Sequence, residues 1–131
     1  MDSNTAPEAV VARFFAAIEA GDTDTLQRLY HPGALVWHNT GNLEQDVTAN
    51  LRVPRWVGRN VRGLKYGDIR RTLTGDGRVL QQHVLRGIGP SGTAVEIPAA
   101  IVFTVDSAGL VTRVEEYLDS AATAALVETS R

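Results

Sequence analysis

The first third of the chain carries hydrophobic residues at helical spacing. The apolar positions that recur every three to four residues are Val11, Phe14, Phe15 and Ile18. Pro7 suits the first turn of a helix and Gly21 ends one, so we predict a helix between them. Asp22 or Thr23 can cap a second, short helix that continues to Tyr30.

Between residues 31 and 60 the pattern changes twice. The tripeptide His31-Pro32-Gly33 is expected to break the chain, and the apolar run 34–38 is typical of a short strand. Residues 46–60 return to helical spacing. Pro54 lies inside this stretch and supplies no backbone N–H, so it must either kink the helix or start a second one.

The second half of the chain alternates strand-like segments with turn signals. Four segments rich in valine, isoleucine and leucine are predicted strands: 64–73, 79–88, 94–105 and 110–118. Glycine-containing turns at 75–77, 89–92 and 106–109 separate them, and a last helix is expected over 121–128. Helices followed by a run of strands predict an α+β fold, in which a curved antiparallel sheet wraps the N-terminal helices into a cone.

Length and composition fit one globular domain. The 131 residues are 44% hydrophobic and 21% charged, so we expect a single domain over residues 1–131 with one core and a modest cavity. A formal net charge of −2 gives no overall attraction to nucleic acid or membrane lipid. The chain has no cysteine, which excludes a disulfide scaffold, a thiolate zinc site and a cysteine nucleophile. No signal-peptide pattern or long apolar run is present, and the expected location is cytoplasmic.

Several stretches of sequence resemble the nuclear-transport-factor-two-like superfamily and, within it, the SnoaL-like proteins. Residues Val10–Asp22 resemble its opening helix, while Val84–Arg86, Pro90–Gly92 and Glu116–Asp119 resemble the limonene epoxide hydrolase and SnoaL-like branch. The resemblance covers nearly the whole chain and implies a cystatin-like, cone-shaped fold, which hosts many chemistries. It also implies a homodimer formed through the outer face of the sheet. The residues expected on that face are Val84, Val102 and Tyr117.

The positions that are catalytic in ketosteroid isomerase carry other residues in this chain. Phe14, His38 and Ile101 stand at the positions of its tyrosine, its base and its second aspartate. The SnoaL-like cyclases also place a catalytic aspartate near Ile101. Neither phenylalanine nor isoleucine donates a hydrogen bond, so the resemblance does not carry that steroid isomerisation over to this chain.

The Asp-Arg-Asp relay of limonene epoxide hydrolase corresponds to His83, Gln81 and Glu116. Strand alternation predicts that Gln81 and His83 lie on the same face of their strand. By the same rule, Val114, Glu116 and Leu118 lie on one face of the last strand. Because Gln81 is uncharged, it lacks the effect of an arginine on the pKa of its neighbours. This departure argues against epoxide hydrolysis but leaves acid–base chemistry open.

These residues lead to a hypothesis about the site. We expect His83 and Glu116 to meet in an apolar cavity with His38 near its mouth, and to share a proton near neutral pH. Together they would act on a water or a carbon acid, with Gln81 orienting them and His38 or Asn39 binding a substrate oxygen. The remaining residues expected to contact the ligand are Phe14, Tyr30, Trp37, Leu85, Ile97, Ile101, Val114 and Leu118.

Each assignment has a plainer alternative. A histidine in a strand is more often a core or surface residue than a catalyst, and Glu116 can be the solvated member of the pair Glu115-Glu116. The register near His38 leaves open whether Trp37 and Asn39 face inward instead. The histidines lack the spacing of metal motifs, so we expect neither a metal nor a cofactor.

Basic residues are concentrated in one segment. Residues 52–71 hold seven of the 13 basic residues and one acid, Asp68. Four of the seven follow helical spacing: Arg52, Arg55, Arg59 and Arg62. Such a stripe can bind an anionic or phosphate-bearing ligand, such as a coenzyme A thioester. The interpretation we favour is a solvated helix face, balanced by the acidic last strand or by a dimer mate.

Three classes of function follow from these observations. The first is a cofactor-independent acid–base enzyme of isomerase, cyclase, lyase or epoxide-hydrolase type, acting on a small apolar substrate of polyketide or terpenoid character. The second is a ligand-binding or accessory protein that keeps the pocket without the chemistry. The third is a protein-interaction module that uses the arginine stripe, and its binding would fall steeply with added salt.

Overall fold

The computed structural model describes residues 5–127. Its helices are α1 (Pro7–Glu19), α2 (Thr23–Leu29), α3 (Val47–Asn50), α4 (Arg52–Asn60) and α5 (Ala124–Val127), with the 3-10 helices η2 (Thr40–Asn42) and η3 (Ser120–Thr123). Its strands are β1 (Tyr30–His38), β2 (Leu43–Asp46), β3 (Arg62–Leu73), β4 (Val79–Ile88), β5 (Ala94–Val105) and β6 (Val111–Leu118).

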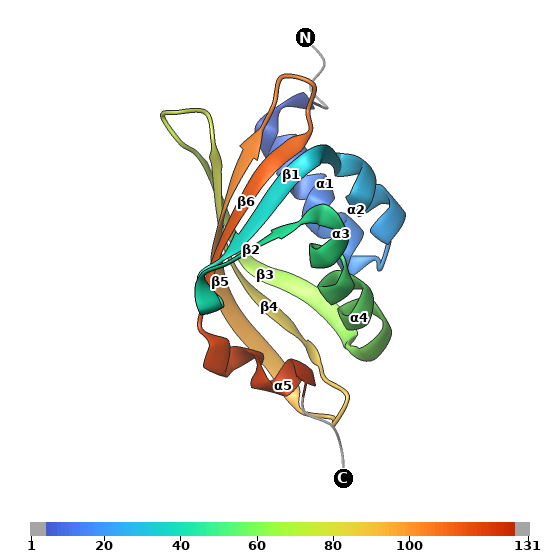
Figure 1. Cartoon of the computed structure of the whole chain (residues 1–131). Helices are drawn as coiled ribbons and strands as arrows, with labels where there is room; N and C mark the ends of the chain where they lie inside the picture. The colour runs from blue at the N-terminus through green and yellow to red at the C-terminus, as the bar shows by residue number, and fades with distance from the viewer. Residues whose placement is uncertain (1–4, 128–131) are drawn as a thin grey trace.

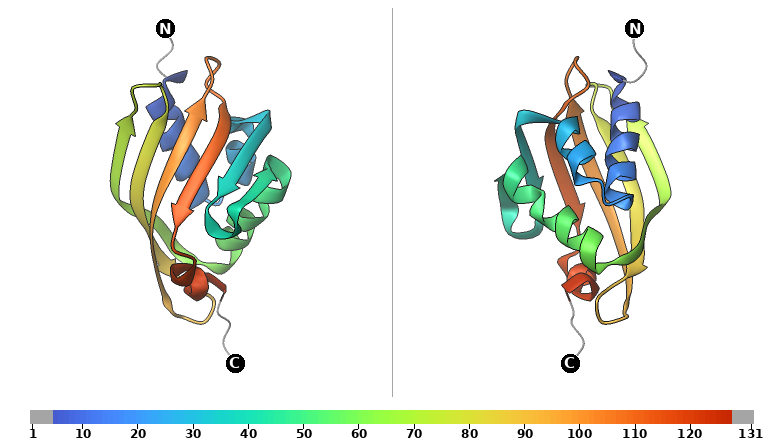
Figure 2. Two further views of the ribbon diagram at one scale, coloured as in Figure 1. Left: turned by 60° about the vertical axis from the view of Figure 1, so that its left-hand side comes forward. Right: turned by 90° about the vertical axis from the view of Figure 1, so that its right-hand side faces the viewer.

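The strands form one curved sheet in the order β2-β1-β6-β5-β4-β3. Helices α1 to α4 lie on one face of this sheet and leave the other face uncovered (Figures 1 and 2). The predicted α+β fold, with helices packed against a curved sheet, is therefore confirmed. The sheet is mixed rather than wholly antiparallel, because β1 runs parallel to β6. This pairing brings the first long strand beside the last one.

The first half of the chain follows its sequence pattern with two differences. The first two helices lie where predicted, and the Asp22 side chain caps α2 by accepting a hydrogen bond from the Thr25 N–H. The predicted break at His31-Pro32-Gly33 is wrong, since these residues belong to β1, although the pairing with β6 shifts register there. Pro54 lies in the first turn of α4, where its missing N–H costs nothing, so it starts a second helix. Strand β2 was not predicted.

The second half matches the predicted strands and turns closely. The predicted last helix begins as η3 and continues as α5, and residue 128 lies outside the described residues. Within residues 5–127, no helix has both the length and the apolar character that a membrane crossing requires.

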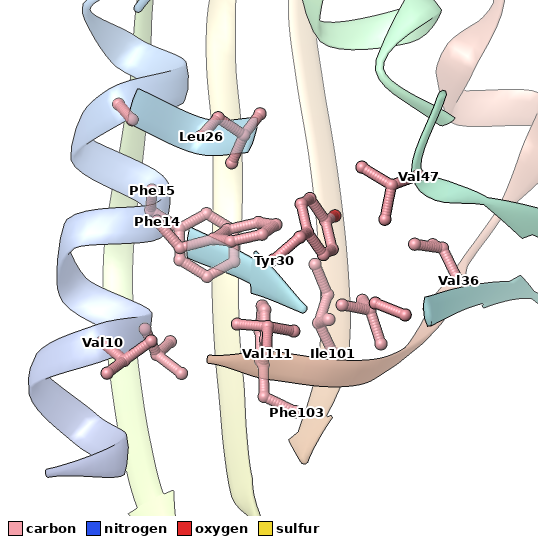
Figure 3. Packing of buried hydrophobic residues seen from close by; sticks show 14 of the residues in the cluster. Val10, Phe14, Phe15, Leu26, Tyr30, Val36, Val47, Ile101, Phe103 and Val111 are labelled. Carbon is pink, nitrogen blue, oxygen red and sulfur yellow. The ribbon is translucent and has the colours of Figure 1, made fainter. Parts of the chain in front are cut away.

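The core lies between α1 and the covered face of the sheet (Figure 3). Phe103 of β5 is fully buried, and its ring meets those of Phe14 and Phe15 edge-on at centroid distances of 5.0 and 5.5 Å. Edge-to-face pairs of this kind add stability beyond the burial of apolar area. This aromatic cluster fixes α1 against the sheet and so sets one wall of the space beside it.

We expect Phe103→Ala to lower the free energy of unfolding by about 3–5 kcal/mol, because it removes buried apolar area and leaves a cavity. Chemical denaturation followed by circular dichroism measures this change. Leu73→Ala is the matched control, since Leu73 is 51% exposed, and it should change the free energy by no more than about 0.5 kcal/mol. Equal effects of the two substitutions would contradict this description of the core.

Candidate functional site

A cavity of about 380 Å³ lies between the helices and the covered face of the sheet. This volume falls within the range of about 300–1,000 Å³ that is typical of small-molecule sites. Ten of the residues predicted to form the site line it: Phe14, Tyr30, His38, His83, Leu85, Ile97, Ile101, Val114, Glu116 and Leu118. The lining is mostly aliphatic and aromatic, with a small number of polar side chains.

One polar group of the cavity is a hydrogen-bonded pair, His38 with Glu116. The parallel register of β1 and β6 places these two residues directly beside each other. His38 Nδ1 lies 2.9 Å from Glu116 Oε1. His38 Nε2 lies 2.9 Å from Oδ1 of Asn50, at the end of α3. Both ring nitrogens of His38 are therefore held by side chains of the protein.

The neighbours of His38 favour its protonated form. The hydrogen bond to Glu116 is the main reason that the pKa of His38 lies above its usual value, and the Asn50 bond and the Glu116 charge act in the same direction. Burial opposes them but does not prevail. In its protonated form the ring donates from both nitrogens, one N–H to Glu116 and the other to the amide oxygen of Asn50.

The predicted contact between His83 and Glu116 is wrong. Both side chains line the cavity, but β5 lies between their strands, and Glu116 is opposite Ile101, whose partner on β4 is Gln81. Two strand spacings amount to about 10 Å, which is too far for a hydrogen bond between strands. Glu116 therefore takes its partner from β1, on its other side.

His83 occupies an aromatic environment and stays neutral. Its side chain is 5% exposed, and its ring lies 5.1 Å from Phe15 and 4.7 Å from Tyr66 by centroids. Burial lowers the pKa of His83 to about 4, the Glu116 charge opposes that shift, and the Arg71 charge adds to it. At neutral pH the ring is an uncharged imidazole that can donate one hydrogen bond and accept another.

Three residues predicted to bind the ligand do not line the cavity. Because His38 faces inward, its neighbours on β1 do not: the Trp37 ring packs against Tyr117, and its indole N–H donates to Asn42. Asn39 is exposed and exchanges two hydrogen bonds with the backbone of Leu118. Gln81 is fully buried and contacts His83, with 2.9 Å between Nε2 and Nδ1.

Five polar residues that line the cavity were missed from the sequence: Thr40, Asn50, Tyr66, Ser120 and Thr123. Asn50 holds His38 and also interacts with the hydroxyl of Tyr30. Its spacing of three residues from the inward Val47 was the available signal. Tyr66 of β3 also lines the cavity. Burial raises the pKa of Tyr30 and of Tyr66, so both hydroxyl groups keep their protons at neutral pH.

The arginine stripe lies apart from these groups. Arg52, Arg55 and Arg59 are exposed on α4. The expected balance by the last strand is not seen among the described ion pairs, because Glu115 of β6 lies near Arg78 and Arg113.

The family model described as the SnoaL-like domain matches residues 11–114. The chain belongs to the SnoaL-like family. Similar solved structures include two candidate polyketide cyclases. The one from Xanthomonas campestris has a TM-score of 0.80 at 20% identity, covering 97% of this chain and 100% of its own. The one from Silicibacter has a TM-score of 0.78 at 20% identity, covering 95% and 97%.

A third similar structure is a candidate isomerase from Bacillus subtilis, with a TM-score of 0.79 at 12% identity, covering 95% of this chain and 94% of its own. At these identities the solved structures establish the fold alone. No curated protein matches the chain. The resemblance to SnoaL-like proteins drawn from the sequence is confirmed, and what this member of the family does must be argued from its own cavity.

We expect Glu116→Gln to lower the pKa of His38 in this SnoaL-like protein, because the carboxylate is the main reason that this pKa is raised. Titration of the His38 ring protons by NMR measures the shift. Glu115→Gln is the control, since Glu115 precedes Glu116 and lies near Arg78 instead. A His38 pKa that is the same in wild type and in Glu116→Gln would contradict the pairing.

Proposed function

We propose that this protein is an acid–base enzyme of the isomerase or cyclase type, which removes a proton next to a carbonyl group in a small apolar substrate. The observation that carries this proposal is the distribution of charge in the cavity. On one side His38 lies 2.9 Å from the Glu116 carboxyl group, and on the other side the uncharged His83 lies two strands away from Glu116, with Tyr66 one strand further. Proton removal from carbon needs a base on one side and stabilisation of the resulting oxyanion on the other.

Glu116 is the base in this proposal. Both nitrogens of His38 are engaged by Glu116 and Asn50, so His38 has no free position at which to take a proton from a substrate. The described hydrogen bonds of Glu116 use only Oε1, which leaves Oε2 as a free acceptor. His38 thus serves to orient the carboxylate, which differs from the sequence-based hypothesis, in which His38 stands at the position of the ketosteroid isomerase base or binds a substrate oxygen.

The oxyanion would be stabilised by His83 and Tyr66. The Tyr66 hydroxyl keeps its proton, and the neutral His83 ring stacks edge-on against it. A neutral imidazole is a suitable donor to an enolate, because an uncharged ring does not attract the Glu116 carboxylate away from the substrate. A ketone would place its α-carbon near Glu116 and its oxygen near this pair.

The substrate class follows from the walls of the cavity. Aliphatic and aromatic side chains, among them Phe14, Ile101 and Leu118, form most of the lining. Burial of apolar surface would then provide most of the binding energy, while the polar groups fix the orientation. A polyketide- or terpenoid-like ketone has this combination of an apolar skeleton and a carbonyl oxygen.

We expect the protein to catalyse exchange of the α-hydrogens of 2-tetralone with deuterium from D₂O, a reaction that NMR follows directly. Glu116→Gln should slow this exchange by about 10²–10⁴-fold, the usual contribution of a general base. It should leave binding of 2-tetralone within a few fold, because the amide keeps the shape of the side chain. Glu115→Gln is the matched control and should exchange at the wild-type rate.

The two other outcomes of this experiment have distinct meanings. If 2-tetralone binds but its hydrogens exchange no faster than in buffer, the protein is a ligand-binding member of the fold and the enzymatic proposal is wrong. If exchange is catalysed equally by wild type and Glu116→Gln, the base has been misassigned.

We also propose that the uncovered face of the sheet forms a homodimer. Tyr117 is 46% exposed on this face, next to Trp37, and Leu35 is 39% exposed. Light scattering at micromolar concentration should give twice the mass of one chain, and Tyr117→Arg should shift it towards the monomer. A monomer in the wild type at that concentration would contradict this proposal.

A further inference from the structure

A chain of hydrogen bonds connects the edge strand of the sheet to the imidazole in the cavity. Arg71 of β3 donates its Nε–H to Oε1 of Gln81, at 2.6 Å. Nε2 of Gln81 lies 2.9 Å from Nδ1 of His83. Gln81 is fully buried and Arg71 is half-buried. Arg71 is not among the positions that correspond to the limonene epoxide hydrolase relay, which are His83, Gln81 and Glu116.

The direction of each hydrogen bond follows from the atoms available. A guanidinium group has only donors, so the Gln81 atom that faces Arg71 must be the amide oxygen. The amide nitrogen then faces His83, and because this nitrogen can only donate, Nδ1 of His83 must accept. A neutral imidazole that accepts at Nδ1 carries its hydrogen on Nε2.

The contact between Arg71 and Gln81 depends on a β-bulge. Gly67 pairs with Val84 and Arg70 pairs with Gln82, so β3 holds one more residue than β4 between these pairs. Asp68 lies within the bulge at a φ of 52°, in the left-handed region. In a regular strand Tyr66 and Arg71, five residues apart, would face opposite sides. The extra residue restores the alignment, so that both face the cavity side of the sheet.

We propose that Arg71 is a positioning residue, which acts through Gln81 to hold His83 in the Nε2–H tautomer. Within residues 5–127 no hydrogen bond of the Nε2 atom is described, and His83 lines the cavity, so this N–H is the group that a ligand can meet. The charged groups that act on the ring are Arg71 from β3 and Glu116 from β6. The assignment of the tautomer depends only on the hydrogen-bond geometry, whereas a catalytic role of the Nε2–H group rests on the proposed function.

This arrangement selects a ligand chemistry. A fixed N–H favours a carbonyl, enolate or other acceptor oxygen at this point of the cavity. It disfavours an amine or another pure donor, because two donors would then face each other in an apolar environment where neither is satisfied. Through Gln81, a residue that does not line the cavity thus determines which polar group the cavity accepts.

The test is a long-range ¹H–¹⁵N NMR spectrum of protein labelled with ¹⁵N-histidine at pH 7, in which the two ring nitrogens report the tautomer. The chain has three histidines, so His83→Phe assigns the signals of interest. We expect wild-type His83 to be neutral with its hydrogen on Nε2. An Nδ1–H tautomer or a charged ring in the wild type overturns the proposal.

Variants test the role of Arg71 itself. Gln81→Glu places a carboxylate between Arg71 and His83, so the ring should move its hydrogen to Nδ1. Arg71→Met should give a mixture of tautomers, because the Gln81 amide is then free to turn over, and Arg71→Lys should restore the wild-type spectrum. Gln82→Glu and Arg70→Met are the matched controls at exposed neighbouring positions and should leave it unchanged.

A wild-type spectrum in Arg71→Met would overturn the role of Arg71, and Arg71→Met remains informative if the buried Gln81→Glu fails to fold. For turnover, Arg71→Met should lower kcat for 2-tetralone exchange more than it changes KM. If the tautomer is as expected but His83→Phe exchanges 2-tetralone at the wild-type rate, the inference about Arg71 stands and the catalytic use of His83 fails.

Discussion

The parallel pairing of β1 with β6 is the constraint on which the site depends. It sets His38 directly beside Glu116, while α3 places Asn50 against the other nitrogen of the imidazole. Partial burial opposes the charged form of a carboxyl group or an imidazole, and an opposite charge beside either group favours it. The hydrogen bond between the two side chains raises the pKa of His38 and fixes the position of Glu116 beside the apolar cavity, and the proposed chemistry depends on that position.

The opposite side of the cavity is governed by a different principle. His83 has aromatic neighbours and a pKa of about 4, so it contributes a dipole and no charge. The pKa values of the two histidines are therefore shifted in opposite directions within one cavity, upward for His38 by its hydrogen bond to Glu116 and downward for His83 by burial. In acid–base sites, two residues of the same type often take different roles because their environments shift their pKa values apart.

Much of the fold, and the side of the sheet on which the site residues lie, could be predicted from the sequence, because both depend on local sequence pattern. Period-two alternation correctly placed His83 and Glu116 on the cavity side of the sheet, and helical spacing located α1 and α2. Pairing between strands is not local: nothing near Glu116 in the sequence indicates that its partner is His38 rather than His83. The bulge at Asp68 is equally hidden, and it reverses the alternation that would have turned Arg71 away from Gln81.

A crystal structure with bound 2-naphthol, a planar mimic of the enolate of 2-tetralone, would show whether Glu116 and His83 face opposite ends of one ligand. We expect the naphthol inside the cavity, with its oxygen about 3 Å from Nε2 of His83 and its C1 edge facing the Glu116 carboxylate. A naphthol whose oxygen contacts Glu116, or one bound only outside the cavity, would contradict this expectation.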